Sequence, residues 1–368
     1  MAAAGAVVVS PGVAAADPLG HTGIRSAMSA AVAVGVPGSI ARADDLQGSW
    51  RGSAGTSQLG LQRPRQTNER FRVGSVSKTF AATVVLQLEA ERRLSLGDTV
   101  EHWLPGMVSG NGNDGSRITL RQLLNHTSGI YDYVVDPAFQ QRIGTEDFLW
   151  HRFDTWRPED LIRIAMSHAP LFPAGSAWGY SSTDYILAGL VIEKATGHPP
   201  DREIERRIIT PLRLYGTSIP GTSPVIPGPH GHGYTKFTPG GPSYDTTAIN
   251  PSWGGTAGDI ISTTSDLNRF MRALIGGNLL PRRQLAEMLD AVPTGDRLRT
   301  GYGLGIFRFQ FPCGTTVWGH TGGIHGYTTF VGTTPDTRHT LSVNNNVYGA
   351  GSVQAIAQAE FCASASHP

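Results

Sequence analysis

A serine and a lysine three positions apart, Ser75 and Lys78, are the residues of this sequence whose types and spacing most directly suggest chemistry. They lie in the stretch FRVGSVSKTFAATVVL, residues 71–86, which is mainly apolar after the lysine. On a helix, side chains three positions apart lie on one face, with Cβ atoms about 5 to 6 Å apart. The helix N-terminus adds free backbone N–H groups and the positive end of the helix dipole. The arrangement suits a serine nucleophile with an amine as its base.

The choice of lysine at position 78 is informative because the chain contains only three lysines, Lys78, Lys194 and Lys236, among its 30 cationic side chains. A lysine removed from water by apolar neighbours can lose its proton, whereas an arginine stays charged. Gly74 would permit a tight entry to the helix. A structural alternative is a lysine in the first helical turn that extends its ammonium to water along its own methylenes. The spacing alone does not decide between these two interpretations.

The composition limits which class of protein this can be and which partners it can bind. The 368 residues, 39% hydrophobic and 16% charged, are enough for a large core and for one or two domains. The net charge of +1, a pI of about 7.9 and the lack of any block of like charges argue against a nucleic-acid or anionic-membrane partner. No apolar run reaches the length of a membrane-spanning helix. We therefore expect a globular protein whose partner is a small molecule or a peptide.

The N-terminus and the cysteines suggest export. Residues 1–17 are small and mostly apolar and end in AAAD, as at the cleavage site of a secretory signal. We interpret them as the remnant of such a signal, with a disordered alanine-rich tail or a cloning remnant as alternatives. The only cysteines are Cys313 and Cys362, and a lone pair in a secreted chain usually forms a disulfide. Two buried free thiols would be the other possibility.

The hydrophobic patterns along the chain place strands at both ends and helices between them. A helix at 23–34 precedes two short strands at 38–45 and 49–55, and a long apolar helix is predicted at 75–94. Further strands are predicted from residue 300 onward, and a last helix at 352–362. Amphipathic helices are predicted in the middle of the chain at 159–168, 183–196, 202–209, 265–275 and 282–291.

This order predicts an α+β fold, in which an antiparallel sheet is flanked by the N- and C-terminal helices and an all-helical lobe is inserted. We expect one catalytic module at residues 18–366, with an α/β lobe formed by 18–80 and 295–366 and a helical lobe formed by 81–294. A ligand would bind in the cleft between the two lobes.

Two further segments complete a pattern that resembles the serine β-lactamase and penicillin-recognising DD-peptidase superfamily, whose fold agrees with the one just described. The resemblance spans nearly the whole chain, and the stretches 123–133 and 252–267 also look like family segments. Within the superfamily, the sequence most resembles secreted actinomycete D-alanyl-D-alanine carboxypeptidases and class C β-lactamase-like enzymes. The S-x-x-K motif corresponds to Ser75–Lys78, the Y-x-N motif to Tyr180-Ser181-Ser182, and the K-T-G motif to His320-Thr321-Gly322.

The resemblance implies that Ser75 attacks a carbonyl to form an acyl-enzyme while Lys78 and Tyr180 move the proton. It also implies that His320 steadies the Tyr180 hydroxyl or the leaving group, and we expect this histidine to titrate nearer neutral pH than a lysine would. The expected oxyanion hole consists of the backbone N–H groups of Ser75 and Gly323. The other expected substrate contacts are Ser182, Trp253, Thr321, Gly322, Gly323 and His325.

Each residue alone has a structural explanation: Tyr180 as an aromatic at a helix start, His320 as a satisfied strand histidine, Trp253 as part of the core. The three motifs in order favour catalysis over these. No cofactor or metal is implied. His230 and His232 in GPHGHGY suggest zinc only weakly, because a third ligand is not evident.

Three positions depart from the family pattern. Ser182 stands where an asparagine is usual, and serine is shorter and has one donor instead of two. Phe307 stands where the carboxypeptidases have an arginine that holds the substrate carboxylate, and Gly323 replaces a hydroxyl residue. Arg308 is adjacent, but one step along a strand turns it to the other face. The clamp for a free carboxylate is therefore expected to be missing.

The sequence predicts a secreted active-site serine hydrolase of the D-alanyl-D-alanine carboxypeptidase or β-lactamase type. The missing clamp keeps open an esterase, a D-aminopeptidase or D-amino-acid amidase, and a peptide-cyclising acyltransferase of the same superfamily. A non-hydrolytic penicillin-binding sensor is the alternative outside enzymes. Whether Lys78 or Tyr180 is the base in acylation also remains open.

Overall fold

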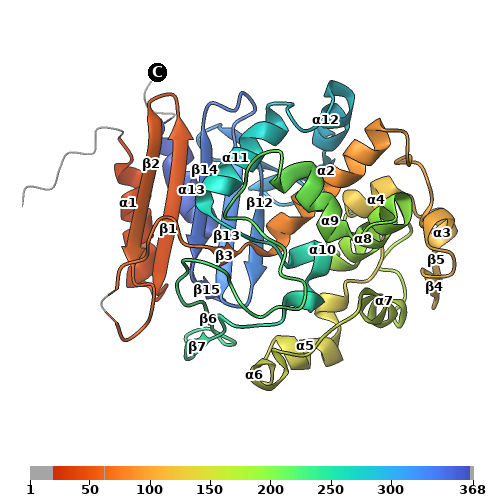
Figure 1. Cartoon of the computed structure of the whole chain (residues 1–368), viewed down its shortest axis with the longest axis horizontal. Helices are drawn as coiled ribbons and strands as arrows, with labels where there is room; N and C mark the ends of the chain where they lie inside the picture. Colours follow the sequence, from red (N-terminus) through yellow and green to blue (C-terminus); the bar gives the residue numbers. More distant parts are fainter. Residues whose placement is uncertain (1–19, 62, 365–368) are drawn as a thin grey trace, which may run out of the picture.

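One antiparallel sheet organises the computed structural model, which describes residues 20–61 and 63–364 (Figure 1). Its strand order is β2-β1-β14-β13-β12-β11-β10-β9, so strands from the two ends of the chain meet where β1 pairs with β14. The predicted α+β fold is confirmed. The strands are β1 (Gly38–Asp45), β2 (Gly48–Gly55), β9 (Val292–Pro293), β10 (Arg299–Tyr302), β11 (Phe307–Gln310), β12 (Thr316–Ile324), β13 (Tyr327–Thr333) and β14 (Thr340–Asn345).

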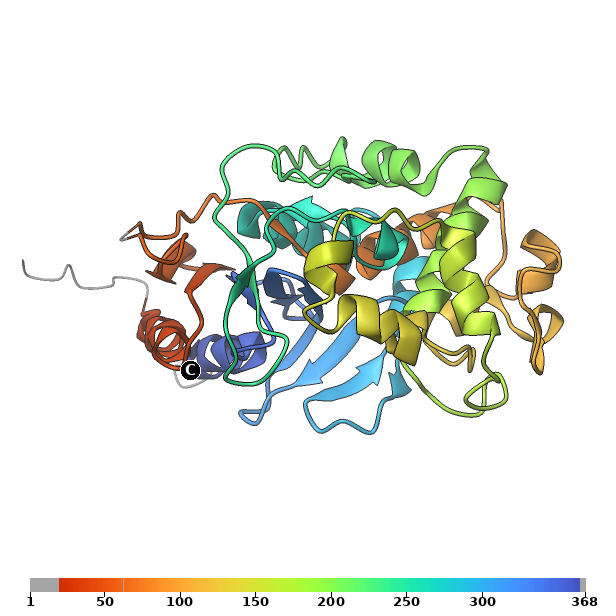
Figure 2. The same cartoon turned by 90° about the horizontal axis from the view of Figure 1, so that it is seen from below.

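Helices cover both faces of the sheet, because successive strand residues point to opposite sides. Phe330 of β13 packs in a cluster with α1 (Thr22–Ala33) and α13 (Val353–Ser364). Its neighbour Val331 belongs to the main core with α2 (Ser77–Ala90) and α11 (Thr264–Ile275). Figures 1 and 2 show α1 and α13 side by side at one end of the molecule, with the helical lobe at the other.

Cys313 and Cys362 form a disulfide with Cα atoms 5.5 Å apart, which confirms the predicted pairing. The bond joins the turn after β11 to α13. It therefore holds the C-terminal helix to the sheet, and it reduces the conformational freedom of the unfolded chain. Residues 1–17, interpreted from the sequence as the remnant of a secretory signal, lie outside the described part of the chain.

The long apolar helix is shorter than predicted. A 3₁₀ turn at Gly74–Val76 leads into α2, which ends at Ala90 rather than continuing to residue 94. Arg92 adopts a left-handed backbone with φ of 59°, which a continuing helix cannot accommodate. Eleven residues of α2 are buried, so the helix runs through the core and its start is fixed on all sides.

The inserted helices occur near the predicted positions. The stretch predicted as one helix at 202–209 divides into α9 and a π-helical turn at Glu205–Ile209. The helix predicted at 265–275, α11, packs on β1, β13 and β14, so it belongs with the sheet and not with the inserted helical lobe. The remaining helices are α3 (Val100–Trp103), α4 (Leu120–Leu124), α5 (Pro137–Ile143), α6 (Phe148–His151), α7 (Pro158–Met166), α8 (Ser182–Thr196), α9 (Pro200–Ile204), α10 (Gly255–Gly258) and α12 (Arg282–Leu289).

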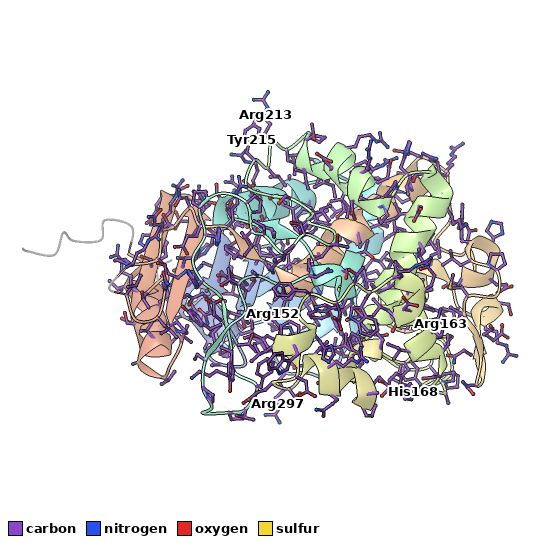
Figure 3. All side chains as sticks on the ribbon, turned by 60° about the horizontal axis from the view of Figure 1, so that its bottom comes forward. Arg152, Arg163, His168, Arg213, Tyr215 and Arg297 are labelled. Carbon is purple, nitrogen blue, oxygen red and sulfur yellow. A yellow bond between two sulfur atoms is a disulfide. The ribbon has the colours of Figure 1, made fainter. Side chains whose placement is uncertain are left out.

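The short strands β6 and β7 lie, with the helices α5 and α6, at the bottom of the molecule in Figure 1. Arg152, labelled in Figure 3, donates to the carbonyl of Asp245 at 3.1 Å, and its own carbonyl accepts from Asn250 at 2.7 Å.

Within the described residues, no helix combines the length and apolarity needed to cross a membrane. The short strands are β3 (Phe71–Arg72), β4 (Ser109–Gly110), β5 (Asn113–Asp114), β6 (Tyr234–Thr235), β7 (Tyr244–Asp245), β8 (Ile261–Ser262) and β15 (Val347–Tyr348).

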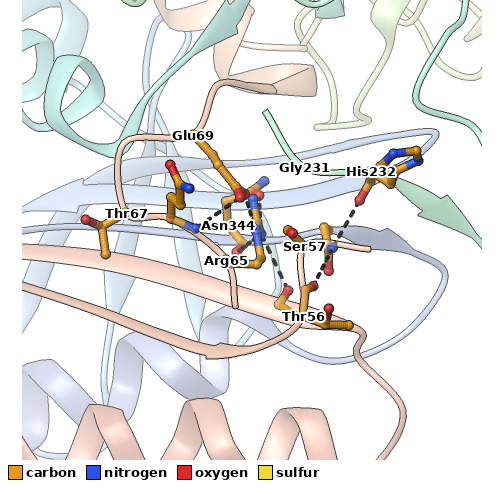
Figure 4. A network of polar contacts seen from close by, with 12 residues as sticks. Thr56, Ser57, Arg65, Thr67, Glu69, Gly231, His232 and Asn344 are labelled. Atoms are coloured by element: carbon orange, nitrogen blue, oxygen red, sulfur yellow. Dashed lines mark hydrogen bonds and ion pairs between the residues drawn. The ribbon is translucent and has the colours of Figure 1, made fainter. Parts of the chain in front are cut away.

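A buried ion pair ties the segment before β3 to the sheet (Figure 4). Arg65 pairs with Glu69 at 2.8 Å and donates to the side-chain and backbone oxygens of Asn344 at 3.0 and 3.1 Å. The same network extends to Ser57, whose carbonyl accepts from the N–H of His232 at 2.8 Å. The ring of His232 contacts Asp245, and no group of three metal-ligating side chains occurs among the described residues.

We expect Glu69→Ala to lower the free energy of unfolding by roughly 3 to 5 kcal/mol, because it leaves the fully buried Arg65 guanidinium unpaired. Glu287→Ala is the matched control, since Glu287 pairs with Arg121 at the surface, where an ion pair contributes about 1 kcal/mol or less. Denaturant unfolding of both variants measures the difference. Equal losses in the two variants would contradict the role given to the buried pair.

Candidate active site

Ser75 lies in the 3₁₀ turn that opens α2, directly against the end of β12. Gly74 has a left-handed φ of 56°, and a Cβ on it would lie 2.7 to 2.8 Å from backbone atoms of Gly323. A Cβ on Gly322 would collide with the carbonyl oxygen of Val73 and lie 3.0 Å from the nitrogen of Ser75. Glycine at both positions therefore lets the turn that carries Ser75 and the strand β12 approach each other closely.

Lys78 is fully buried one turn behind Ser75, which rules out the surface-lysine alternative. Its Nζ lies 3.2 Å from Ser75 Oγ and 3.4 Å from Ser182 Oγ, and it donates to the carbonyl of Ala257 at 2.9 Å. None of the described acidic side chains is close enough to form an ion pair with it, although Asp132 and Asp184 act on it from farther away. The amine is held by neutral oxygens, beside the serine.

Burial lowers the pKa of Lys78 to about 7, although the charges of Asp132 and Asp184 partly oppose the effect. Burial raises the pKa of Tyr180 above its ordinary value, although the nearby Ser75 hydroxyl partly opposes the effect. At neutral pH the tyrosine thus remains a phenol, whereas a large fraction of Lys78 is the neutral amine. Of the two residues, Lys78 has the pKa suited to a general base.

The pKa of Lys78 predicts the pH dependence of the reaction. Below about pH 7 the amine is protonated and cannot accept the serine proton, so kcat/KM should rise with pH and level off above this pKa. Measuring kcat/KM between about pH 5 and about pH 9 should give a single acid limb with a midpoint near 7. A rate that does not change across this interval would contradict the assignment.

His320 does not behave as the sequence suggested. Its Nε2 lies 3.1 Å from the Tyr302 hydroxyl and its Nδ1 lies 2.5 Å from the carbonyl of Thr321, while no hydrogen bond to Tyr180 occurs among the described residues. Burial, with the nearby charges of Lys78 and Arg299, lowers the pKa of His320 to about 3. The expectation of a histidine that titrates near neutral pH is wrong: it stays neutral, and the acid limb should persist in His320→Gln.

A buried histidine–aspartate pair positions Tyr180. The His126 ring lies 4.3 Å from the Tyr180 ring, and its Nδ1 lies 2.9 Å from a carboxylate oxygen of Asp184. The other oxygen of Asp184 accepts from Ser128 at 2.6 Å. Sequence reasoning noted the segments containing these residues but not their roles. A histidine next to a Thr-Ser-Gly turn and an aspartate two residues after the Y-x-N position were the available signals.

The predicted catalytic residues Ser75, Lys78 and Tyr180 line a cavity of about 350 Å³. Among the residues predicted from the sequence, Thr321, Gly322 and His320 do not line this cavity, although they belong to the adjoining strand. Side chains that the sequence reasoning missed include Asp132, Gln140, Ile143 and Tyr348. The predicted residues that do line it are Ser75, Lys78, Tyr180, Ser182, Trp253, Gly323 and His325.

A model of the beta-lactamase family matches residues 23–363. The chain belongs to this family of serine hydrolases. A crystal structure of a D-stereospecific amidohydrolase from Streptomyces sp. has a TM-score of 0.89 and 48% sequence identity, over 93% of this chain and 98% of that chain. The D-amino acid amidase from Ochrobactrum anthropi SV3, complexed with L-phenylalanine amide, has a TM-score of 0.80 and 25% identity, over 93% and 97% of the two chains.

Two penicillin-binding proteins are also similar to this chain. Penicillin-binding protein 4* of Bacillus subtilis is 28% identical over 310 residues, 80% of this chain and 64% of that protein. Penicillin-binding protein 4 of Amycolatopsis lactamdurans is 28% identical over 291 residues, 73% of this chain and 70% of that protein. The present chain therefore spans slightly less than two-thirds of the Bacillus protein.

The structure explains how the departures from the beta-lactamase-family pattern alter the pocket. Phe307 is buried and its ring packs against Tyr302 and His320, with ring centroids 4.5 and 5.0 Å apart. Arg308 donates to Thr300 and does not line the catalytic cavity. A different cation, Arg299 of β10, lies over the Phe307 ring at 5.4 Å. No arginine lines the cavity within the described residues.

The far wall of the beta-lactamase-type pocket is aromatic and uncharged. His325 donates a hydrogen bond through Nε2 to the carbonyl of Ile143 at 2.6 Å, and its ring stacks on Phe148 with ring centroids 3.6 Å apart. Burial lowers the pKa of His325 to about 4, so the ring is neutral, and it donates this hydrogen bond. Trp253 meets it edge to face at 5.5 Å. The wall thus favours an apolar substrate group over a charged one.

Proposed function

We propose that this protein is a serine hydrolase that cleaves amides or esters of D-amino acids through an acyl-enzyme on Ser75. The reaction type is supported by one observation above all: a fully buried Lys78, with a pKa of about 7, lies 3.2 Å from the serine oxygen. The substrate class is supported by the 48% identity to a D-stereospecific amidohydrolase over 93% of the chain.

In this mechanism neutral Lys78 takes the proton from Ser75 Oγ as the oxygen attacks the substrate carbonyl carbon. The backbone N–H groups of Ser75 and Gly323 receive the developing oxyanion. The carbonyl of Ala257 accepts a hydrogen bond from the lysine ammonium. That proton then passes, through the neutral Tyr180 hydroxyl, to the departing amine or alkoxide. A water molecule then attacks the acyl-enzyme by the same kind of steps, with Ser75 as the leaving group, and the free acid is released.

A D-alanyl-D-alanine carboxypeptidase is the second candidate. It is supported by the penicillin-binding relatives and by Arg299, whose guanidinium over Phe307 supplies a cation close to the missing clamp position. Arg299 is also paired with Asp296 at 2.9 Å, which reduces the charge it offers to a substrate carboxylate. We favour the amidase for this reason and because no arginine among the described residues lines the cavity.

The test compares the enantiomers of phenylalanine amide, which are matched in every property except configuration. We expect ammonia release from the D-amide to be faster by at least about 10²-fold. Acid-quenched protein should carry the phenylalanyl group, as an ester, by intact mass spectrometry. Equal rates, or hydrolysis of neither, would contradict the proposal. Turnover of D-alanyl-D-alanine peptides instead would favour the carboxypeptidase, and a stable penicillin adduct without turnover of any ester would favour a sensor.

We also propose that the protein acts outside the cytoplasm. The Cys313–Cys362 disulfide supports this, because such bonds persist in oxidising compartments. Expression of the full chain followed by assay of the culture medium and the cell lysate tests it. Activity confined to the lysate, with both thiols alkylatable, would contradict the proposal.

A further inference from the structure

A second cavity, of about 240 Å³, shares a wall with the catalytic pocket. The wall is the segment 252–259, whose residues divide between the two. Trp253, Gly254, Ala257 and Gly258 line the catalytic pocket, whereas Ser252, Gly255, Thr256 and Asp259 line the second cavity. Because the two sets of lining residues are different, the second cavity is a separate space on the other side of α10.

The lining of the second cavity combines apolar surface with carboxyl groups. Its apolar walls come from α7, α8 and the loops beside them, and include Trp156, Leu161, Ile186 and Leu190. Three carboxylates, Glu193, Asp201 and Asp259, also line it. In the described part of the chain no lysine, arginine or histidine lines the cavity to balance them.

Asp259 is the decisive residue of this cavity. Only 5% of it is exposed, yet no other residue forms a hydrogen bond or an ion pair with its carboxylate in the described structure. Arg72 acts on it only from beyond ion-pair distance, and burial together with the charge of Asp201 raises the pKa of Asp259 well above its ordinary value. A buried carboxylate without a partner is costly, and a cation in the cavity would remove that cost.

We propose that this cavity binds a small organic cation, a primary ammonium carried on an apolar body. The ammonium would lie between Asp259 and Asp201, and the apolar body would pack against Leu190 and Trp156. The volume of about 240 Å³ matches a molecule no larger than a phenylethylamine. This site is independent of the acyl chemistry at Ser75.

Binding should strengthen as pH rises toward neutrality, because an ammonium stabilises the ionised form of Asp259 and its binding releases the proton held there. The other charged groups that face this carboxyl are Asp201, which opposes its ionisation, and Arg72, which favours it. Glu193 lies at the same cavity and acts on Asp201.

The experiment is isothermal titration of the full chain with 2-phenylethylammonium, and with 2-phenylethanol as the matched neutral probe. Neither probe has a scissile carbonyl, so the outcome does not depend on the proposed hydrolysis. We expect saturable binding of the ammonium and at least about tenfold weaker binding of the alcohol. Asp259→Asn should weaken ammonium binding by at least about tenfold, whereas Asp132→Asn, which removes a carboxylate from the catalytic pocket, should not.

Leu190→Trp provides a second variant that fills the cavity and leaves every carboxylate in place, in case Asp259→Asn fails to fold. It should abolish binding. The proposal is overturned if the two probes bind equally, if neither binds, or if binding survives Asp259→Asn and is lost in Asp132→Asn. Titration with Ca²⁺ distinguishes a metal site: calcium binding that needs Asp259, without ammonium binding, would also overturn it.

Discussion

Ser75→Ala should lower kcat by about 10⁴-fold or more on any substrate that the wild type hydrolyses. The alanine removes the oxygen that must form the acyl bond, while the neighbouring Lys78 and its hydrogen bond to Ala257 remain. Ser182 Oγ, which lies 3.4 Å from the same amine, remains in this variant but is not at the S-x-x-K serine position. The measurement is the steady-state rate, with intact mass spectrometry to confirm that no acyl adduct forms.

The matched control is Ser77→Ala, two residues farther along the same segment. Ser77 Oγ donates to the carbonyl of Gly74 at 2.8 Å and accepts from the N–H of Ile260 at 3.1 Å. We expect this variant to lose roughly 1 to 3 kcal/mol of stability, because a buried N–H is left unpaired, but still to form the adduct. An adduct on Ser75→Ala, or its loss in a folded Ser77→Ala alone, would contradict the assignment of the nucleophile.

The parts of the fold that could be predicted are those with strong local signals. The strands β1 and β2 flank a short polar turn, and both were predicted within a residue of their ends. The disulfide was predictable because the chain has only two cysteines. The end of α2 was not, because the left-handed backbone of Arg92 falls within a sequence that would also suit a helix. The packing of α11 on the sheet was not predictable either, because an amphipathic pattern does not say which surface covers the apolar face of the helix.

The candidate site shows the same division. Ser75 and Lys78 are near each other in the sequence, so their contact follows from helical spacing. The neutral state of His320 does not follow from the sequence pattern. It depends on Tyr302 and Phe307, whose rings enclose the histidine only after β10, β11 and β12 pair. Contacts across long sequence separations thus set the protonation states, and these are the properties that the sequence pattern leaves undetermined.

Lys78→Arg tests whether the reaction needs an amine that can lose its proton. The guanidinium keeps its proton at every accessible pH, so it cannot accept the proton of Ser75 although the positive charge is preserved. We expect acylation to slow by roughly 10²- to 10⁴-fold, the usual contribution of a general base. The acid limb near pH 7 should disappear with it, because the group that titrates there has been removed. Rapid-quench measurement of adduct formation separates this step from deacylation.

The interpretation needs two companion variants, because Lys78 is fully buried and a permanent charge there could simply unfold the protein. Lys78→Met removes the amine without burying a charge, and it should be folded and equally slow. Lys194→Arg makes the same chemical change at an exposed position of α8, and it should keep the wild-type rate and pH profile. If folded Lys78→Arg acylates as fast as the wild type, the amine is not the base. If it is slow but retains the acid limb near pH 7, that limb belongs to another group, and Tyr180 with its neighbours His126 and Asp184 becomes the proton-transfer path to test.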